Sequence, residues 1–171
     1  MPQTPLIRDA TPDDAAAIAA IYRHYVLTHT ATFETDPPDA AEMTARMQRI
    51  TQSGMPYLVA EDESSIVGYS YATTYRPRAA YRHTIEDSVY VAPGRTGGGI
   101  GYALLERLLA LAGDRGYREV IAIIGDSANA PSIKLHDRAG FVHVGTLRNV
   151  GFKFDRWLDT VVMQKSLGSG E

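Results

Sequence analysis

The 171-residue sequence contains no cysteine, which excludes disulfides, thiolate metal sites and a cysteine nucleophile. It also lacks an excess of basic charge: the formal net charge is -3 and the isoelectric point is about 5.9, which argues against nucleic acid or an anionic membrane as a partner. No apolar run approaches the length of a membrane span, and the first residues carry prolines and charges instead of a secretory signal. The histidines show no metal-ligand spacing. We therefore expect a cytoplasmic protein that needs no metal.

The length and the 44% hydrophobic content suit one domain with a substantial core, and no repeat or linker divides the chain. We expect this domain to span residues 5–167 and to be followed by a flexible tail, 168–171.

Apolar spacing predicts both helices and strands. Helices are expected after Thr11 and after Asp39, with a loop over Thr30–Pro38 between them, and two more after the glycine-rich stretch and after Asn129. The expected strands are Leu6–Arg8, Tyr57–Ala60, Ile66–Tyr75, Thr84–Val91, Val120–Ile124, Phe141–Thr146 and Thr160–Gln164. This order indicates an α/β sandwich of mixed strands and not an alternating doubly wound fold.

A glycine-rich loop, Thr96–Gly101, connects a predicted strand to a predicted helix. Backbone amides without side chains at a helix N-terminus favour a phosphate, although a flexible turn would use the same residues. A Walker motif does not fit, because no Lys-Ser or Lys-Thr follows the last glycine. The spacing of a dinucleotide fingerprint is also absent, since Gly97 and Gly99 lead to Tyr102.

Together with Val89-Tyr90-Val91 and Pro93, this loop resembles the coenzyme A segment of the GNAT N-acetyltransferase superfamily. The run Asn129 to Phe141 resembles that family's later signature, with His136 at the usual tyrosine position and Thr96 where Gln or Arg is usual. The coenzyme-binding residues that the resemblance implies are Val89, Tyr90, Val91, Thr96, Gly97, Gly98, Gly99, Ile100, Gly101, Asn129 and Ser132.

Over Ile7–Leu167 the chain is similar to the phosphinothricin and methionine sulfoximine N-acetyltransferase branch, whose members also act on related methionine derivatives. The residues that carry this similarity are Thr32-Phe33, Arg76 to Tyr81, Ile85 to Val91, Gly145 to Arg148 and Gly151 to Asp159. The resemblance implies a GNAT-type, mostly antiparallel central sheet flanked by helices, acetyl-CoA as cosubstrate, a small-molecule amine acceptor and a homodimer.

Acetyl transfer to an amine needs a base, and the resemblance places that carboxylate at Glu86. An oxyanion needs a hydrogen-bond donor, for which the backbone N–H of Val91 is a candidate. His136 is a candidate acid for the departing thiolate, and an ordinary packed histidine is the competing interpretation.

An amino-acid acceptor carries a carboxylate, which arginine binds through two parallel hydrogen bonds. Arg76 and Arg78 are candidates for this contact, and Asp87 is grouped with them as a substrate-binding residue. Phe33 and Tyr81 are candidate walls of the acceptor pocket, with ordinary packing as the alternative.

Three other functions stay open at this point. A peptide or protein N-acetyltransferase of the same fold would need an open channel. A sensor that binds acetyl-CoA without turnover is compatible with the unusual Thr96 and His136. A dinucleotide-binding enzyme is the remaining alternative.

Overall fold

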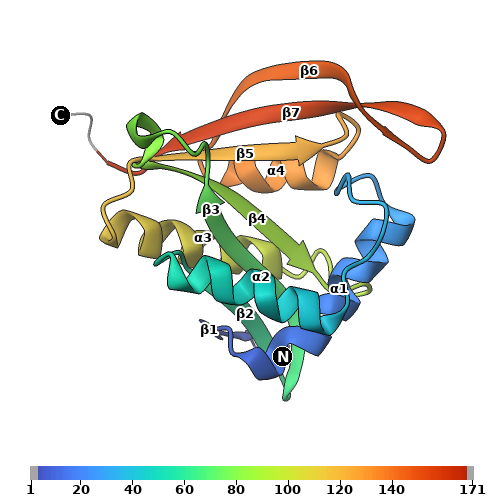
Figure 1. The fold of residues 1–171 in the computed structure, drawn as a ribbon, viewed down its shortest axis with the longest axis vertical. Coiled ribbons are helices and arrows are strands. Elements are labelled where there is room, and N and C mark those ends of the chain that lie inside the picture. Colours follow the sequence, from blue (N-terminus) through green and yellow to red (C-terminus); the bar gives the residue numbers. More distant parts are fainter. Residues whose placement is uncertain (1–3, 169–171) are drawn as a thin grey trace.

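Seven strands form one sheet in the order β1-β2-β3-β4-β5-β7-β6 in the computed structural model, which describes residues 4–168 (Figure 1). The strands are β1 (Leu6–Asp9), β2 (Tyr57–Asp62), β3 (Ser65–Thr74), β4 (Thr84–Val91), β5 (Glu119–Gly125), β6 (Val142–Lys153) and β7 (Arg156–Ser166). The helices are α1 (Ala15–Thr28), α2 (Ala40–Gln52), α3 (Ile100–Asp114) and α4 (Ala130–Arg138), with short 3-10 turns η1 (Pro12–Asp14) and η2 (Ala79–Tyr81). The predicted fold class is confirmed, while the predicted flexible tail lies outside the described residues except for Gly168.

Within residues 4–168, β4 and β5 are the one parallel pair of neighbours, and the other pairs are antiparallel. Their pairing runs from Thr84 opposite Glu119 to Asp87 opposite Ala122 and stops there. Both strands then continue and diverge, as Figure 1 shows. The sheet therefore opens in its middle while both halves stay intact.

Two hydrophobic cores cover the two faces of the sheet. One gathers the leucines of α3 with Ile85 of β4 and Phe141 after α4, and the other gathers Ile18 of α1 and Met47 of α2 with the tyrosines of β2 and β3. None of the helices in the described part of the chain is long and apolar enough to cross a membrane.

The β6–β7 hairpin is much longer than the sequence predicted. The expected strands were Phe141–Thr146 and Thr160–Gln164, but the turn lies at Phe154-Asp155, where φ is +53° and +58°. Such a tight turn usually contains asparagine or glycine, and neither is present at this position. Exposed apolar residues also replace the alternation of a half-buried strand, so the usual sequence signals are missing.

The first helical segment is anchored by the carboxylate of Asp14. Arg8 of β1 donates to both of its oxygens at 2.8 and 2.9 Å, and the backbone N–H of Thr11 donates at 2.8 Å. Asp14 is buried, and the hydrogen bonds from Arg8 hold its pKa below the usual 3.8 in spite of that burial. The start signal predicted at Thr11 is therefore confirmed, and it leads through η1 into α1.

Replacing Asp14 by asparagine should lower the free energy of unfolding at neutral pH by about 1–3 kcal/mol, because Arg8 loses a charged acceptor in a buried position. A group whose pKa is lowered by folding stabilises the protein above its unfolded pKa and stops doing so as the pH falls through its folded pKa. The difference between wild type and Asp14→Asn in urea unfolding should therefore shrink below about pH 3.8. The control Asp13→Asn changes an exposed neighbour, and an equal effect of both variants would contradict the anchoring role.

Candidate active site

A groove of about 810 Å³ opens where β4 and β5 separate. Its walls are the ends of these strands, the glycine loop, one side of α4 and the end of α1 with the residues that follow it. The predicted coenzyme-binding residues that line it are Val89, Tyr90, Val91, Thr96, Gly97, Gly99, Ile100, Gly101, Asn129 and Ser132. Gly98 alone of that predicted set is not in the lining.

The edge of β4 offers free backbone groups to this groove. Ala92 donates its N–H to the carbonyl oxygen of Val67 at 2.9 Å, and the carbonyl oxygen of Thr84 accepts from the N–H of Tyr75. The backbone N–H and C=O groups of the even-numbered residues of β4 therefore point toward β3. Alternate residues of a strand direct their backbone groups to opposite sides, and Val89 and Val91 therefore face the gap left by β5. The carbonyl of Val91 accepts a hydrogen bond from the hydroxyl of Tyr25 at 2.6 Å, which leaves its N–H directed at the groove.

The glycine loop delivers the N-terminus of α3 to the other end of the groove. Gly97 and Gly99 have φ of +83° and +82°, which disfavours residues with a side chain. Gly99 is the N-cap and has no side-chain cap, so the first N–H groups of α3 remain available to an anion.

Two basic residues of α4 at this end were not found by sequence reasoning. Lys134 and Arg138 both line the groove, one helical turn apart on α4, and the Arg138 guanidinium lies 4.1 Å from the centre of the Tyr102 ring. The spacing of four residues, which places both side chains on one face of a helix, was the signal available in the sequence. Arg95 also lines the groove and pairs with Asp62 of β2.

Glu86 lies one residue before the separation of the strands. Because side chains alternate along a strand, it faces the α1–α2 side of the sheet, whereas the groove lining includes its neighbour Asp87. Burial raises the pKa of Glu86, the charge of Asp87 raises it further, and the charge of Arg76 opposes the shift. This environment suits a carboxylate that has to accept a proton near neutral pH.

Asp87 forms a buried pair with a histidine. Sequence analysis grouped it with substrate-binding arginines, but it is buried, and its Oδ2 lies 2.9 Å from Nε2 of His136 on α4. Nδ1 of His136 lies 2.8 Å from the carbonyl oxygen of Ser132. His136 is buried as well, and both residues line the groove, so the pair lies at the floor of the groove.

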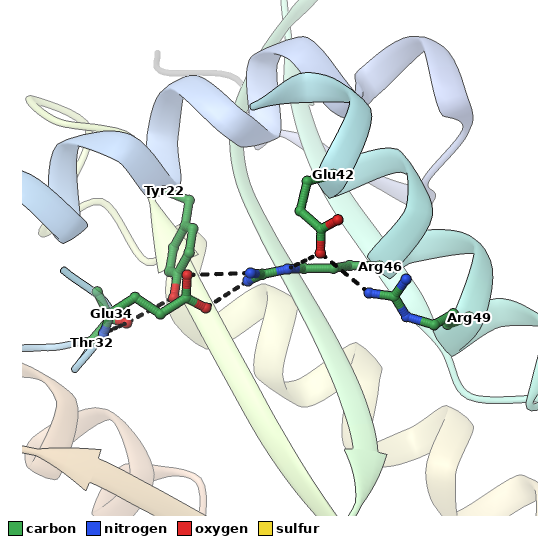
Figure 2. Close-up of polar contacts among 6 residues, drawn as sticks. All are labelled: Tyr22, Thr32, Glu34, Glu42, Arg46 and Arg49. Atoms are coloured by element: carbon green, nitrogen blue, oxygen red, sulfur yellow. Dashed lines mark hydrogen bonds and ion pairs between the residues drawn. The ribbon is translucent and has the colours of Figure 1, made fainter. Parts of the chain in front are cut away.

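The loop between α1 and α2 forms the wall nearest the end of β5, and polar contacts hold it from several sides. The hydroxyls of Tyr22 and Thr32 are 2.8 Å apart, and Glu34 accepts from Arg46 of α2 at 2.6 Å, as Figure 2 shows. In the same figure Glu42 accepts from both Arg46 and Arg49. Its contact with Arg46 orients the Arg46 side chain toward the loop.

Lys153 of β6 anchors this loop from the opposite side. Its Nζ donates to the carbonyl oxygens of His29 and Thr32, both at 2.8 Å, and the residue is only 3% exposed. Burial lowers the pKa of this amine. Phe33 follows directly and packs against two glycines: a Cβ on Gly151 would stand 2.3 Å from its ring, and one on Gly125 would stand 3.1 Å from it.

The remaining predicted acceptor-site residues do not line the groove. Arg76, Arg78 and Tyr81 are exposed in and before η2, and Arg76 lies over the ring of Tyr75 while its charge reaches Glu86. Phe33 stands beside the groove, at Gly125. In residues 4–168 no three histidine or acidic side chains are grouped so that they could hold a metal ion.

A sheet split between parallel strands, with free strand-edge amides at one end of a groove and an uncapped helix N-terminus at the other, is the architecture of an acetyl-CoA-dependent acetyltransferase. The sequence matches the family described as Acetyltransferase (GNAT) domain over residues 7–162. The chain therefore belongs to the GNAT acetyltransferase family.

Two relatives are similar over nearly the whole chain. A phosphinothricin N-acetyltransferase of Alcaligenes faecalis is 52% identical over 96% of this chain and 84% of its own length. An L-methionine sulfoximine/L-methionine sulfone acetyltransferase of Pseudomonas paraeruginosa is 40% identical over 94% of both chains.

Solved structures agree with this assignment. A phosphinothricin acetyltransferase from Sinorhizobium meliloti, in complex with acetyl-CoA, superposes with a TM-score of 0.95 at 46% identity and covers 98% of this chain and 91% of its own. A ribosomal-protein-alanine N-acetyltransferase from Brucella melitensis superposes with a TM-score of 0.92 at 42% identity, covering 94% of this chain and 99% of its own.

Adding a methyl group at Gly151 should displace the Phe33 ring, because one edge of the ring already occupies that position. We expect Gly151→Ala to lose about 1–3 kcal/mol in urea unfolding and to show a displaced ring in its crystal structure. Gly145→Ala in the same strand is the matched control, since a Cβ there meets nothing within 4 Å. An unmoved ring and equal stability of the two variants would contradict this account.

Proposed function

We propose that the chain transfers the acetyl group of acetyl-CoA directly to the α-amine of a small amino-acid-like acceptor, within one ternary complex. The observation that carries the proposal is the position of Glu86, a partly buried carboxylate with a raised pKa, beside the split between β4 and β5. The groove fits the cosubstrate, because strand-edge amides face one end and the open α3 N-terminus, with Lys134 and Arg138, faces the other. The expected cytoplasmic location stays a prediction.

Phosphinothricin, methionine sulfoximine and methionine sulfone are the proposed acceptors. The names of the Alcaligenes and Pseudomonas relatives support this class of compound. The proposed site for the acceptor lies on the Glu86 side of the split, between β4 and the loop that carries Phe33. Arg76 is the favoured arginine for the acceptor carboxylate, because its charge already acts on Glu86.

Three groups of this chain take part in the proposed reaction: the carboxylate of Glu86, the N–H of Val91 and the imidazole of His136. The amine nitrogen forms a bond to the acetyl carbon, and Glu86 takes the proton that the nitrogen releases. The N–H of Val91 stabilises the oxyanion. The carbon–sulfur bond then breaks, and the sulfur takes a proton for which His136 is the proposed source.

A peptide or protein N-acetyltransferase is the second candidate. The specific observation in its favour is the similarity to a structure named ribosomal-protein-alanine N-acetyltransferase. A sensor without turnover is a further outcome of the same assay, which measures binding and thiol release separately.

Acetyl-CoA-dependent thiol release, followed with a thiol-reactive dye, tests the function. The chain has no cysteine, so its own background is low. Release is expected with methionine sulfone, methionine sulfoximine and phosphinothricin, and not with peptides or most ordinary amino acids. Release with peptides alone would reject the acceptor class, and coenzyme binding without any release would indicate the sensor.

Glu86→Gln should lower kcat by about 10²- to 10⁴-fold while coenzyme binding is retained, as expected for loss of a general base. Wild-type activity should fall as the pH drops through the raised pKa of Glu86, and the variant should lack this acid limb. The exposed Glu63→Gln is the control. Full activity of Glu86→Gln would remove Glu86 from the mechanism.

We also propose a homodimer formed through the β6–β7 hairpin. β6 is an edge strand of the sheet, and the hairpin extends beyond the other strands in Figure 1. Exposed apolar side chains along it are Val142, Val144, Leu147, Val150, Phe152, Phe154 and Trp157. An exposed apolar edge strand of this kind invites pairing with another chain, and a second copy would cover it.

Light scattering on a sizing column should give the mass of two chains for the wild type and of one chain for Trp157→Glu. Trp157 is 65% exposed, and tryptophan often dominates an interface. Leu6→Glu is the control, because Leu6 is 62% exposed on the opposite edge strand, β1. A monomeric wild type, or a dimeric Trp157→Glu, would contradict the proposed interface.

A further inference from the structure

Asp87 and His136 form a buried ionisable pair on the floor of the groove. They are 6% and 4% exposed, and they come from different elements, β4 and α4. The second carboxylate oxygen of Asp87, Oδ1, is buried and has no hydrogen-bond partner among residues 4–168. Sequence analysis grouped Asp87 with the substrate-binding residues, and its contact with His136 is visible only in the tertiary structure.

The hydrogen bonds of His136 define where its protons lie. The carbonyl oxygen of Ser132 can only accept, so Nδ1 of His136 must carry a hydrogen. Nε2 either donates to the Asp87 carboxylate or accepts from a protonated Asp87, across 2.9 Å. In both cases the contact between Nε2 and Oδ2 contains one proton, and it is the mobile one of the pair.

The surroundings leave Asp87 as the group that controls His136. The edge of the Phe141 ring faces the imidazole, with ring centres 4.9 Å apart, and β5 and α3 present apolar residues to this side of the sheet. From β4, Glu86 is the other charged group, and it faces the opposite side. Burial alone would lower the pKa of His136, but the hydrogen bond and charge of Asp87 raise it above the usual 6.5.

We propose that Asp87 is a positioning residue for the acetyl transfer, and that it pairs with His136 so that the two groups hold one proton for the departing sulfur. This inference rests on the proposed function. When the carbon–sulfur bond breaks, the proton between Nε2 and Oδ2 passes to the sulfur, which becomes a thiol. A carboxylate and a neutral imidazole remain, and the imidazole still donates from Nδ1 to Ser132. The pair regains its proton from solvent, while Glu86 releases the amine proton.

Asp87→Asn should shift both limbs of the pH–rate profile to lower pH. The basic limb moves because His136, still buried but without its carboxylate, loses its proton at lower pH. The acid limb moves because the charge of Asp87 no longer raises the pKa of Glu86. At pH values above the displaced basic limb, kcat should fall by roughly tenfold or more.

The same variant can be measured without turnover. Proton NMR titration of the imidazole signals, with the His136 signal assigned by its absence in His136→Asn, should show a lower midpoint for His136 in Asp87→Asn. The raised pKa means that the pair stabilises the fold fully below about pH 6.5, and that this stabilisation is lost as the pH rises through the folded pKa. The stability difference between wild type and Asp87→Asn should therefore be largest at acid pH.

Asp137→Asn is the control, because Asp137 follows His136 on α4 but is exposed. Combining Asp87→Asn with His136→Asn should cost no more in kcat than His136→Asn alone, since the two groups act as one unit. If Asp87→Asn does not fold, the smaller Asp87→Ser provides the same measurements.

An unchanged His136 titration midpoint in the Asp87 variant would overturn the inference. So would an unchanged basic limb in an active Asp87 variant, because a merely structural residue changes stability without moving a pH limb. A wild type that acetylates none of the acceptors would instead reject the proposed function, and the NMR titration would still decide whether Asp87 keeps His136 protonated.

Discussion

The separation of β4 from β5 after Asp87 and Ala122 is the constraint on which the site depends. Unpaired backbone groups in a protein interior are costly, so a sheet splits in its middle only where something else takes up the hydrogen bonds. The hydroxyl of Tyr25 donates a hydrogen bond to the carbonyl of Val91, and the free amides at the edge of β4 face the groove. The core on the α3 side joins the two halves of the sheet, since it contains Ile85 of β4 as well as Val120 of β5, so the gap does not require that core to be broken.

The pleat of β4 distributes the chemistry over two faces. Glu86 and Asp87 are consecutive, so one carboxylate points toward the α1–α2 side and the other toward α4. Two neighbouring negative charges that are both partly withdrawn from water raise the proton affinity of Glu86, and His136 compensates the charge of Asp87. A single strand therefore presents Glu86 on one face of the sheet and the Asp87–His136 pair on the other, which is the arrangement that the proposed mechanism uses.

The loop after α1 shows how distant segments build one wall. Lys153, over a hundred residues away in the sequence, donates hydrogen bonds to two carbonyl groups of the loop. Gly151 leaves room for the Phe33 ring because it has no side chain. Burying an amine without a carboxylate partner is costly, and the two short hydrogen bonds to carbonyls offset part of that cost. The long β6–β7 hairpin thus has two roles: its inner residues support the loop, and its outer residues form an exposed apolar surface.

The sequence by itself determined the order of the elements, the glycine loop and the family, because these depend on local periodicity, on glycines with positive φ and on motifs read along the chain. All but one of the predicted coenzyme-binding residues line the groove, since Val89–Val91 and the glycine loop are contiguous segments. Only the tertiary structure decided that Asp87 pairs with His136, that Lys153 supports the Phe33 loop and that the charge of Arg76 acts on Glu86. The physical reason is that these contacts join residues far apart in the sequence, where no local pattern specifies which buried charges will meet.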